Sequence, residues 1–149
     1  MDNKVEIFTA FVSKIWHNIK KITVCEVDGQ TFRGAQVFVI YYLYEHGELT
    51  LTEISERCSE DKATISRAVD FLEENGCVTR VDQENKRYNC PISLTDTGTK
   101  VGREIYHKLA IVLSLASEGV RKHDAAAFYR ALAKISDNLE KIANSDSLF

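Results

Sequence analysis

The feature that most limits the fold of this chain is a pair of closely spaced helix signals. Thr50-Leu51-Thr52-Glu53 fits a capping box, because the Thr50 hydroxyl can accept from the Glu53 amide while the Glu53 side chain reaches back, and it predicts a helix over residues 51–58. Ser59-Glu60-Asp61 offers the cap and first-turn acids of a second helix over residues 62–75. Two short helices joined by so few residues predict a helix-turn-helix.

After Gly76 the period of the apolar residues changes from 3.6 to 2. In residues 88–94 larger side chains alternate with small or polar ones, which indicates a strand, and residues 77–81 are its expected partner. The polar residues 82–87 between them predict a hairpin with a charged tip. Pro91 cannot donate to a strand ladder, so its amide position should face a free edge. Helix pair and hairpin together indicate a winged helix-turn-helix, whose second helix can present its N-terminal side chains to base edges in DNA.

Longer helices are expected on both sides of this core. Residues 3–24 place apolar residues at alternating intervals of three and four, and residues 33–46 form a run that is apolar nearly all round and long enough for a buried helix. Residues 26–30 between them are predicted to be a turn. Amphipathic helices follow over residues 96–118, which Thr95 caps, and over residues 124–143.

The overall charge does not mark this chain as a nucleic-acid binder. Its 149 residues, the size of one domain, hold 19 Lys and Arg against 22 Asp and Glu, for a net charge of −3. Residues 50–95 alone carry 6 basic against 9 acidic side chains. An argument for DNA must therefore depend on where particular cations lie.

The second predicted helix has a surface suited to a duplex. With its apolar residues turned inward, the side chains expected to meet DNA are Lys62, Ala63, Thr64, Ser66 and Arg67. Small residues let the backbone approach closely, and the Arg67 guanidinium is a fork for guanine or phosphate. Thr64 and Ser66 can donate to phosphate oxygens. At the hairpin tip, Lys86 and Arg87 are placed to reach the DNA backbone or an adjacent minor groove.

Each of these signals also has a plainer interpretation. Arg67 could pair with Asp70 or Glu74 on a solvated helix, and Lys86-Arg87 could be a solvated turn. The joint placement of cations at a helix N-terminus and a hairpin tip is what favours DNA.

Other function classes lack their sequence signals. The longest apolar run, Val37 to Tyr44, is far shorter than the roughly 20 residues needed to cross a bilayer. The N-terminus has no secretory signal, so we expect a cytoplasmic protein without membrane contact. No HExxH, GxSxG, Walker or GxGxxG motif is present, so neither catalysis nor a cofactor is expected.

Residues 34–98 resemble the winged-helix core of the MarR (multiple-antibiotic-resistance regulator) family. The matching stretches are LTLTEISERCSEDKATISRAVDFLEENGCVTR and NKRYNCPISLTDTG. The resemblance implies that ATISRAVDFLE is the recognition helix, that Asn85-Lys86-Arg87 is the wing tip with Arg87 entering the minor groove, and that ISLTDTG links the wing to a dimerisation helix. The family has an aspartate where Asn85 stands, so a salt bridge is not expected to hold this wing. Asn85 can hydrogen-bond neighbouring amides or Arg80 instead.

The expected fold is mostly α (α+β), with flanking helices that dimerise. We expect an N-terminal dimerisation helix and turn over 1–32, a winged helix-turn-helix DNA-binding domain over 33–97, and C-terminal dimerisation helices over 98–149. In the family the flanking helices interleave between subunits. The apolar stripes at 5–22 and 128–142 also exceed what one small core can cover. The alternative is that these helices cover only their own monomer's core.

The resulting hypothesis is a dimeric, sequence-specific DNA-binding transcriptional regulator, a repressor that binds a pseudo-palindromic operator in double-stranded DNA. Family members often bind small aromatic or phenolic ligands, which loosens DNA binding, and the candidate lining residues here are Trp16, His17, Phe38, Tyr41 and Tyr42. Aromatic residues at helical spacing can also be core. The alternative function is a winged-helix protein–protein interaction module without direct DNA binding, which the acidic balance of residues 50–95 would suit.

The four cysteines, Cys25, Cys58, Cys77 and Cys90, have no CxxC or zinc-ligand spacing, so we expect buried thiols and no metal. One branch of the family senses organic peroxides with a cysteine in the first helix. That position falls near Lys20 here, and Cys25 lies beyond it in the predicted turn, so this mechanism is not expected. Cys25 could still react if it were exposed, because the nearby Lys21 would favour a thiolate.

Overall fold

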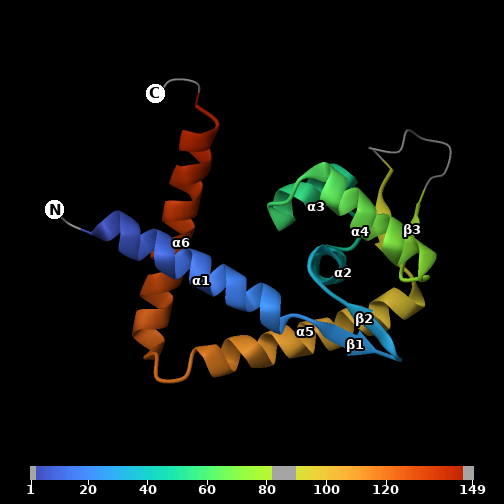
Figure 1. Cartoon of the computed structure of the whole chain (residues 1–149), viewed down its shortest axis with the longest axis horizontal. Helices are drawn as coiled ribbons and strands as arrows, with labels where there is room; N and C mark the ends of the chain where they lie inside the picture. Colours follow the sequence, from blue (N-terminus) through green and yellow to red (C-terminus); the bar gives the residue numbers. More distant parts are fainter. Residues whose placement is uncertain (1–2, 82–89, 146–149) are drawn as a thin grey trace. The chain divides into compact units, whose positions relative to one another are not determined.

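The computed structural model describes residues 3–81 and 90–145, which fall into two compact units, one within residues 1–111 and the other within 112–149. The described residues are mostly helical, with two small antiparallel hairpins (Figure 1). The elements are α1 (Lys4–Ile22), β1 (Cys25–Val27), β2 (Gln30–Phe32), α2 (Ala35–His46), α3 (Leu51–Cys58), α4 (Lys62–Glu74), β3 (Val78–Arg80), β4 (Ile92–Leu94), α5 (Asp96–Ala116) and α6 (Lys122–Ala143).

The helix-turn-helix is α3 and α4, and the capping residues that predicted it are in place. The Thr50 hydroxyl accepts from the Glu53 amide at 3.3 Å, and the Glu53 carboxylate accepts from the Thr50 amide at 2.8 Å, which completes the capping box of α3. Asp61 caps α4 by accepting from the Thr64 amide at 2.8 Å. These bonds satisfy backbone amides that have no partner within their own helix. Both predicted helices are therefore confirmed.

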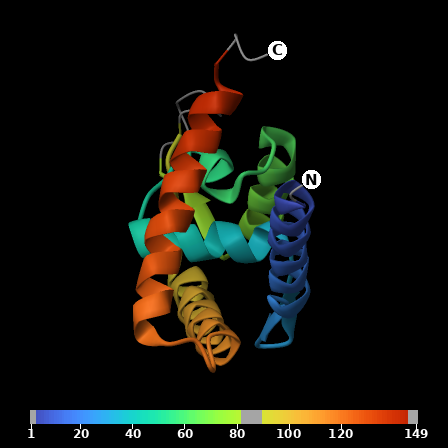
Figure 2. The same cartoon turned by 90° about the vertical axis from the view of Figure 1, so that its left-hand side faces the viewer.

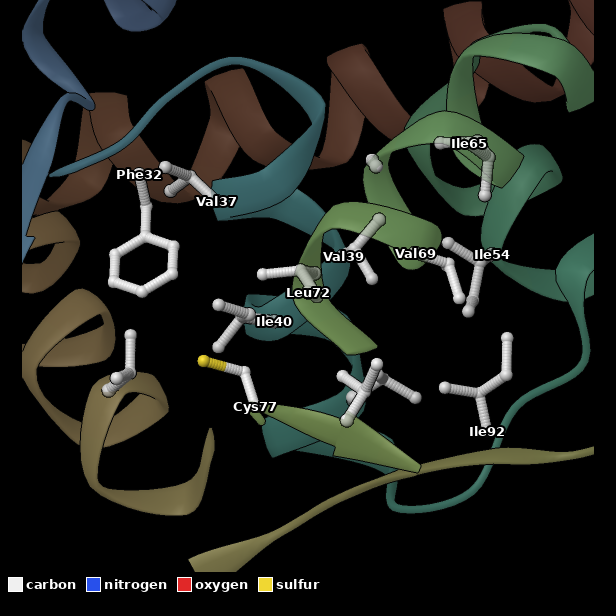
Figure 3. Close-up of a cluster of buried hydrophobic side chains, with 14 of the residues drawn as sticks. Phe32, Val37, Val39, Ile40, Ile54, Ile65, Val69, Leu72, Cys77 and Ile92 are labelled. Carbon is white, nitrogen blue, oxygen red and sulfur yellow. The ribbon is translucent and has the colours of Figure 1, made fainter. Parts of the chain in front are cut away.

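The hydrophobic core lies where α2, α3, α4 and the two hairpins meet (Figure 3). Figure 1 looks along the axis of α2, and Figure 2 shows the same helix from the side. Four of its residues are fully covered: Val37, Val39, Ile40 and Leu43. The prediction of a deeply buried helix is confirmed.

The first hairpin corrects one prediction. The sequence predicted only a turn over residues 26–30, but Cys25–Val27 and Gln30–Phe32 pair as antiparallel strands around Asp28 and Gly29. Both turn residues have positive φ, 50° and 79°, which is the backbone that an Asp-Gly hairpin turn requires. Cys25 therefore belongs to strand β1 rather than to a turn, and its side chain is 5% exposed.

The second hairpin confirms the predicted wing strands. Val78 pairs with Leu94 and Arg80 with Ile92. Ile92 also exchanges two backbone hydrogen bonds with Leu49, at 2.8 and 3.1 Å, which ties the wing to the segment before α3. The wing is thus built on the same core as the helix-turn-helix.

Helices α1 and α6, each in its own unit, bury no residue. Their large exposed apolar side chains include Phe8, Phe11 and Ile15 on α1 and Phe128, Ile135 and Leu139 on α6. Within residues 3–81 and 90–145, no helix is long and apolar enough to span a membrane.

Candidate nucleic-acid interface

The first two turns of α4 present the side chains that the sequence assigned to DNA contact. Lys62, Ala63 and Arg67 are exposed, and Thr64 and Ser66 are half-buried. On the opposite side of the helix, Ile65, Ala68, Val69 and Leu72 are buried in the core. The inward and outward faces of this helix therefore lie as the apolar spacing predicted.

A chain of side-chain hydrogen bonds organises this N-terminal face. The Thr64 hydroxyl donates to the Asp61 carboxylate at 2.8 Å and accepts from the Arg67 guanidinium at 3.2 Å. Hydrogen bonds from the Thr64 amide and hydroxyl, with a smaller contribution from Arg67, lower the pKa of Asp61. Arg67 is thus directed toward the front of α4, and the expected alternative of a pair with Asp70 or Glu74 is replaced by a bond to Thr64.

The acidic residues in the second half of α4 have a partner that sequence reasoning missed. Arg80, on strand β3, contacts Asp70 at 3.2 Å and Glu73 at 3.4 Å. The only available signal was two acids spaced one turn apart on α4, and no local pattern connects them to a strand residue.

The wing tip of the hypothesis, Asn85, Lys86 and Arg87, lies outside the described residues. A contact of Asn85 with Arg80 or of Arg87 with DNA stays a prediction.

Four of the five proposed effector residues form two ring contacts. Trp16 of α1 stacks on Phe38 of α2, with ring centroids 5.5 Å apart, and Tyr41 meets Tyr42 edge-on at 5.3 Å. Trp16 is 40% exposed, and His17 is exposed on α1. Burial is the largest of the causes that raise the pKa values of both tyrosines. The structure therefore brings Trp16 to Phe38 across two helices, and Lys20 Nζ also lies over the Trp16 ring, 4.9 Å from its centroid.

The four cysteines are all buried, as expected. Burial raises the pKa of Cys25 and Cys77, and it raises the pKa of Cys58 to about 12. The exposure that a reactive Cys25 would require is therefore absent, because the side chain is 5% exposed and burial disfavours its thiolate. Among the described residues, no group of three or more His, Cys, Asp and Glu side chains could hold a metal ion.

Residues 34–88 match the family model described as "MarR family". This match confirms the predicted resemblance to the MarR family over residues 34–88. It is 29% identical over 105 residues to the uncharacterized HTH-type transcriptional regulator YfiV of Bacillus subtilis, which covers 70% of this chain and 66% of YfiV. It is 34% identical over 72 residues to the HTH-type transcriptional repressor MdtR of the same organism, covering 48% of this chain and 46% of MdtR. The matched part spans less than two thirds of either relative. Both relatives are named as regulators rather than as enzymes.

Solved structures share the fold over nearly the whole chain. The MarR family regulator NMB1585 from Neisseria meningitidis has a TM-score of 0.78 at 19% identity, covering 95% of this chain and 96% of its own. Staphylococcus aureus MarR in complex with salicylate and kanamycin has a TM-score of 0.77 at 20% identity, covering 93% of both chains. MepR of S. aureus, solved in complex with DNA, has a TM-score of 0.74 at 20% identity, covering 89% of this chain and 97% of MepR. At these identities the likeness concerns the fold.

Proposed function

We propose that this protein regulates transcription by binding double-stranded DNA as a homodimer, with α4 as its recognition helix. The observation that carries the proposal is the N-terminal face of α4, where Lys62 and Arg67 are exposed beside small residues and Arg67 is held forward by Thr64. A helix of this kind can enter the major groove, and a guanidinium can bind guanine through two hydrogen bonds. The DNA complex of the similarly folded MepR supports the same use of the fold.

The homodimer follows from the apolar surface of α1. This helix buries none of its residues, and Phe8, Phe11, Val12 and Ile15 are each at least 40% exposed. Exposed apolar patches on such a scale mark interaction sites. A twofold pair would cover the α1 surface and present two copies of α4 to half-sites about 10–10.5 base pairs apart. The operator would then be pseudo-palindromic, and the named repressor MdtR supports a repressor.

The test is selection of duplexes from a random library, followed by affinity measurements with the selected duplex at two salt concentrations. Binding should weaken with rising salt by ~0.9 log unit per log unit for each neutralised phosphate. Arg67→Ala should cost ~1–3 kcal/mol and relax base preference at one position if Arg67 contacts a base. Arg103→Ala, an exposed arginine on α5, is the matched control. If no duplex is bound in a salt-sensitive way, the proposal is wrong and a protein–protein interaction module replaces it.

We further propose that a small aromatic ligand binds beside the Trp16–Phe38 ring pair, with His17, Tyr41 and Tyr42 as candidate neighbours, and loosens DNA binding. The 40% exposure of Trp16 and the Lys20 ammonium over its ring, which could pair with an aromatic acid, support this, as does the salicylate complex of a similarly folded protein. Trp16 is the single tryptophan of the chain, so its fluorescence reports on this position alone.

Titration with salicylate should quench or shift the fluorescence of Trp16 and lower the affinity for the selected duplex. Phe38→Ala should weaken both effects, while Tyr129→Ala on α6 should leave them unchanged. If millimolar salicylate and related aromatic acids change neither fluorescence nor affinity, this site is not an effector site.

A further inference from the structure

Arg80 is a largely buried cation that links strand β3 to the second half of α4. Its Nη2 lies 3.2 Å from Asp70 Oδ1, and its Nε lies 3.4 Å from Glu73 Oε2. The Arg80 side chain is 12% exposed, whereas the two carboxylate side chains are each 40% exposed. The guanidinium is thus covered, and the two acids that it contacts remain at the surface.

The contact of Arg80 with Asp70 and Glu73 matters because of the charge that α4 carries. Between Lys62 and Glu74 the helix carries two cations, Lys62 and Arg67, and three anions, Asp70, Glu73 and Glu74. Without a partner, the two carboxylates of Asp70 and Glu73 would lie on the same helix as the face that meets phosphates. Like charges repel over distances up to about a Debye length, roughly 8–10 Å at moderate salt. The buried Arg80 guanidinium, which contacts both carboxylates, offsets one of these two negative charges.

The third nitrogen of the guanidinium shows that hydrogen bonds alone do not explain why an arginine stands at position 80. Arg80 Nη1 is buried and has no hydrogen-bond partner in the described part of the chain. An unsatisfied buried donor costs stability, so the arginine stands at a site that is unfavourable for it as an isolated group.

We propose that Arg80 is a positioning residue for DNA recognition: it offsets part of the negative charge of Asp70 and Glu73 beside the DNA-reading face of α4 and holds β3 against that helix. The inference rests on the proposed DNA binding. Arg80 is not itself assigned a phosphate contact, because its side chain is covered and two of its three nitrogens already contact carboxylates. Its effect on DNA is therefore exerted through the acids that it masks.

The test compares affinity for the selected duplex among wild type, Arg80→Gln, and a triple variant that adds Asp70→Asn and Glu73→Gln. Arg80→Gln should weaken binding by about tenfold at low salt, and this loss should shrink at high salt because the exposed carboxylates are screened. The triple variant should return to within about twofold of wild type, since it has no charge left to mask. Thermal unfolding of each variant measures the packing role of Arg80 separately from this charge effect.

A second comparison holds even if Arg80→Gln does not fold. Asp70→Asn with Glu73→Gln, in the presence of Arg80, keeps acceptors for the guanidinium and removes two negative charges, so binding should tighten several-fold. Unchanged affinity in this double variant, or a triple variant as weak as Arg80→Gln, would overturn the masking role. If wild type itself binds no duplex, the proposed function fails as well. If wild type binds with the expected salt dependence and only the rescue fails, the error lies in the role of Arg80 alone.

Discussion

Gly98 of α5 is the residue at which a single added methyl group should do the most damage. Helix α5 begins at Asp96 and meets the junction between α4 and β3 so closely that a Cβ at Gly98 would lie 1.8 Å from the Cys77 carbonyl oxygen. Real Cβ contacts essentially never fall below 3.0 Å. Since the obstacle is backbone rather than a flexible side chain, Gly98→Ala must push α5 away from this junction.

The size of the effect follows from the bonds at this junction. Thr95 donates from its amide to the Cys77 carbonyl at 3.0 Å and from its hydroxyl to the Gly76 carbonyl at 2.6 Å. Overpacking a core costs about 1–3 kcal/mol, and each lost hydrogen bond costs about 0.5–1.5 kcal/mol. Replacing a helical glycine with alanine returns about 1 kcal/mol of helix propensity. We therefore expect Gly98→Ala to lower the free energy of unfolding by about 2–4 kcal/mol.

Gly102, one turn further along α5, supplies the matched control. A Cβ there would meet the side chain of Tyr44 at 2.8 Å, and a side chain can rotate away where a carbonyl cannot. Urea unfolding followed by circular dichroism, at one fixed protomer concentration, measures both variants. The reasoning is refuted if Gly98→Ala is as stable as wild type, or no less stable than Gly102→Ala.

Three further outcomes are expected. Burial raises the pKa of Cys58 from 9.0 to about 12, so the thiol ionises first in the unfolded chain. The free energy of unfolding should therefore fall as pH rises from 9 toward 12. Urea unfolding across that range should show a smaller fall for Cys58→Ala. Thr50→Ala removes the cap of α3 and should cost about 1 kcal/mol, against less than about 0.5 kcal/mol for the neighbouring Thr52→Ala, in thermal melts. Because the pKa of Asp61 is lowered in the folded protein, its carboxylate should stabilise α4 fully above pH 3.8. This stabilisation should be lost as pH falls through the folded pKa. Asp61→Asn, which keeps a cap acceptor, should remove that pH dependence in acid titrations followed by circular dichroism.

Local signals predicted most of the core. The caps of α3 and α4 act within four residues, so Thr50 and Asp61 could be identified as caps without any knowledge of the rest of the fold. The outward placement of Lys62 and Arg67 followed from helical period, because the positions of buried residues fix the opposite face. The β1–β2 hairpin was missed although Asp28-Gly29 is a strong hairpin signal, because the flanking strands have only three residues each.

The sequence by itself determined where α3 and α4 begin, which faces they bury and which side chains α4 presents. Only the tertiary structure decided that Arg80 meets Asp70 and Glu73, that Trp16 stacks on Phe38, and that Gly98 touches the Cys77 carbonyl. Caps and amphipathic faces arise from bonds and periods within one or two turns of a helix. Contacts between separate elements depend on how whole helices and strands pack against one another. No short pattern of residues predicts which side chains that packing brings together.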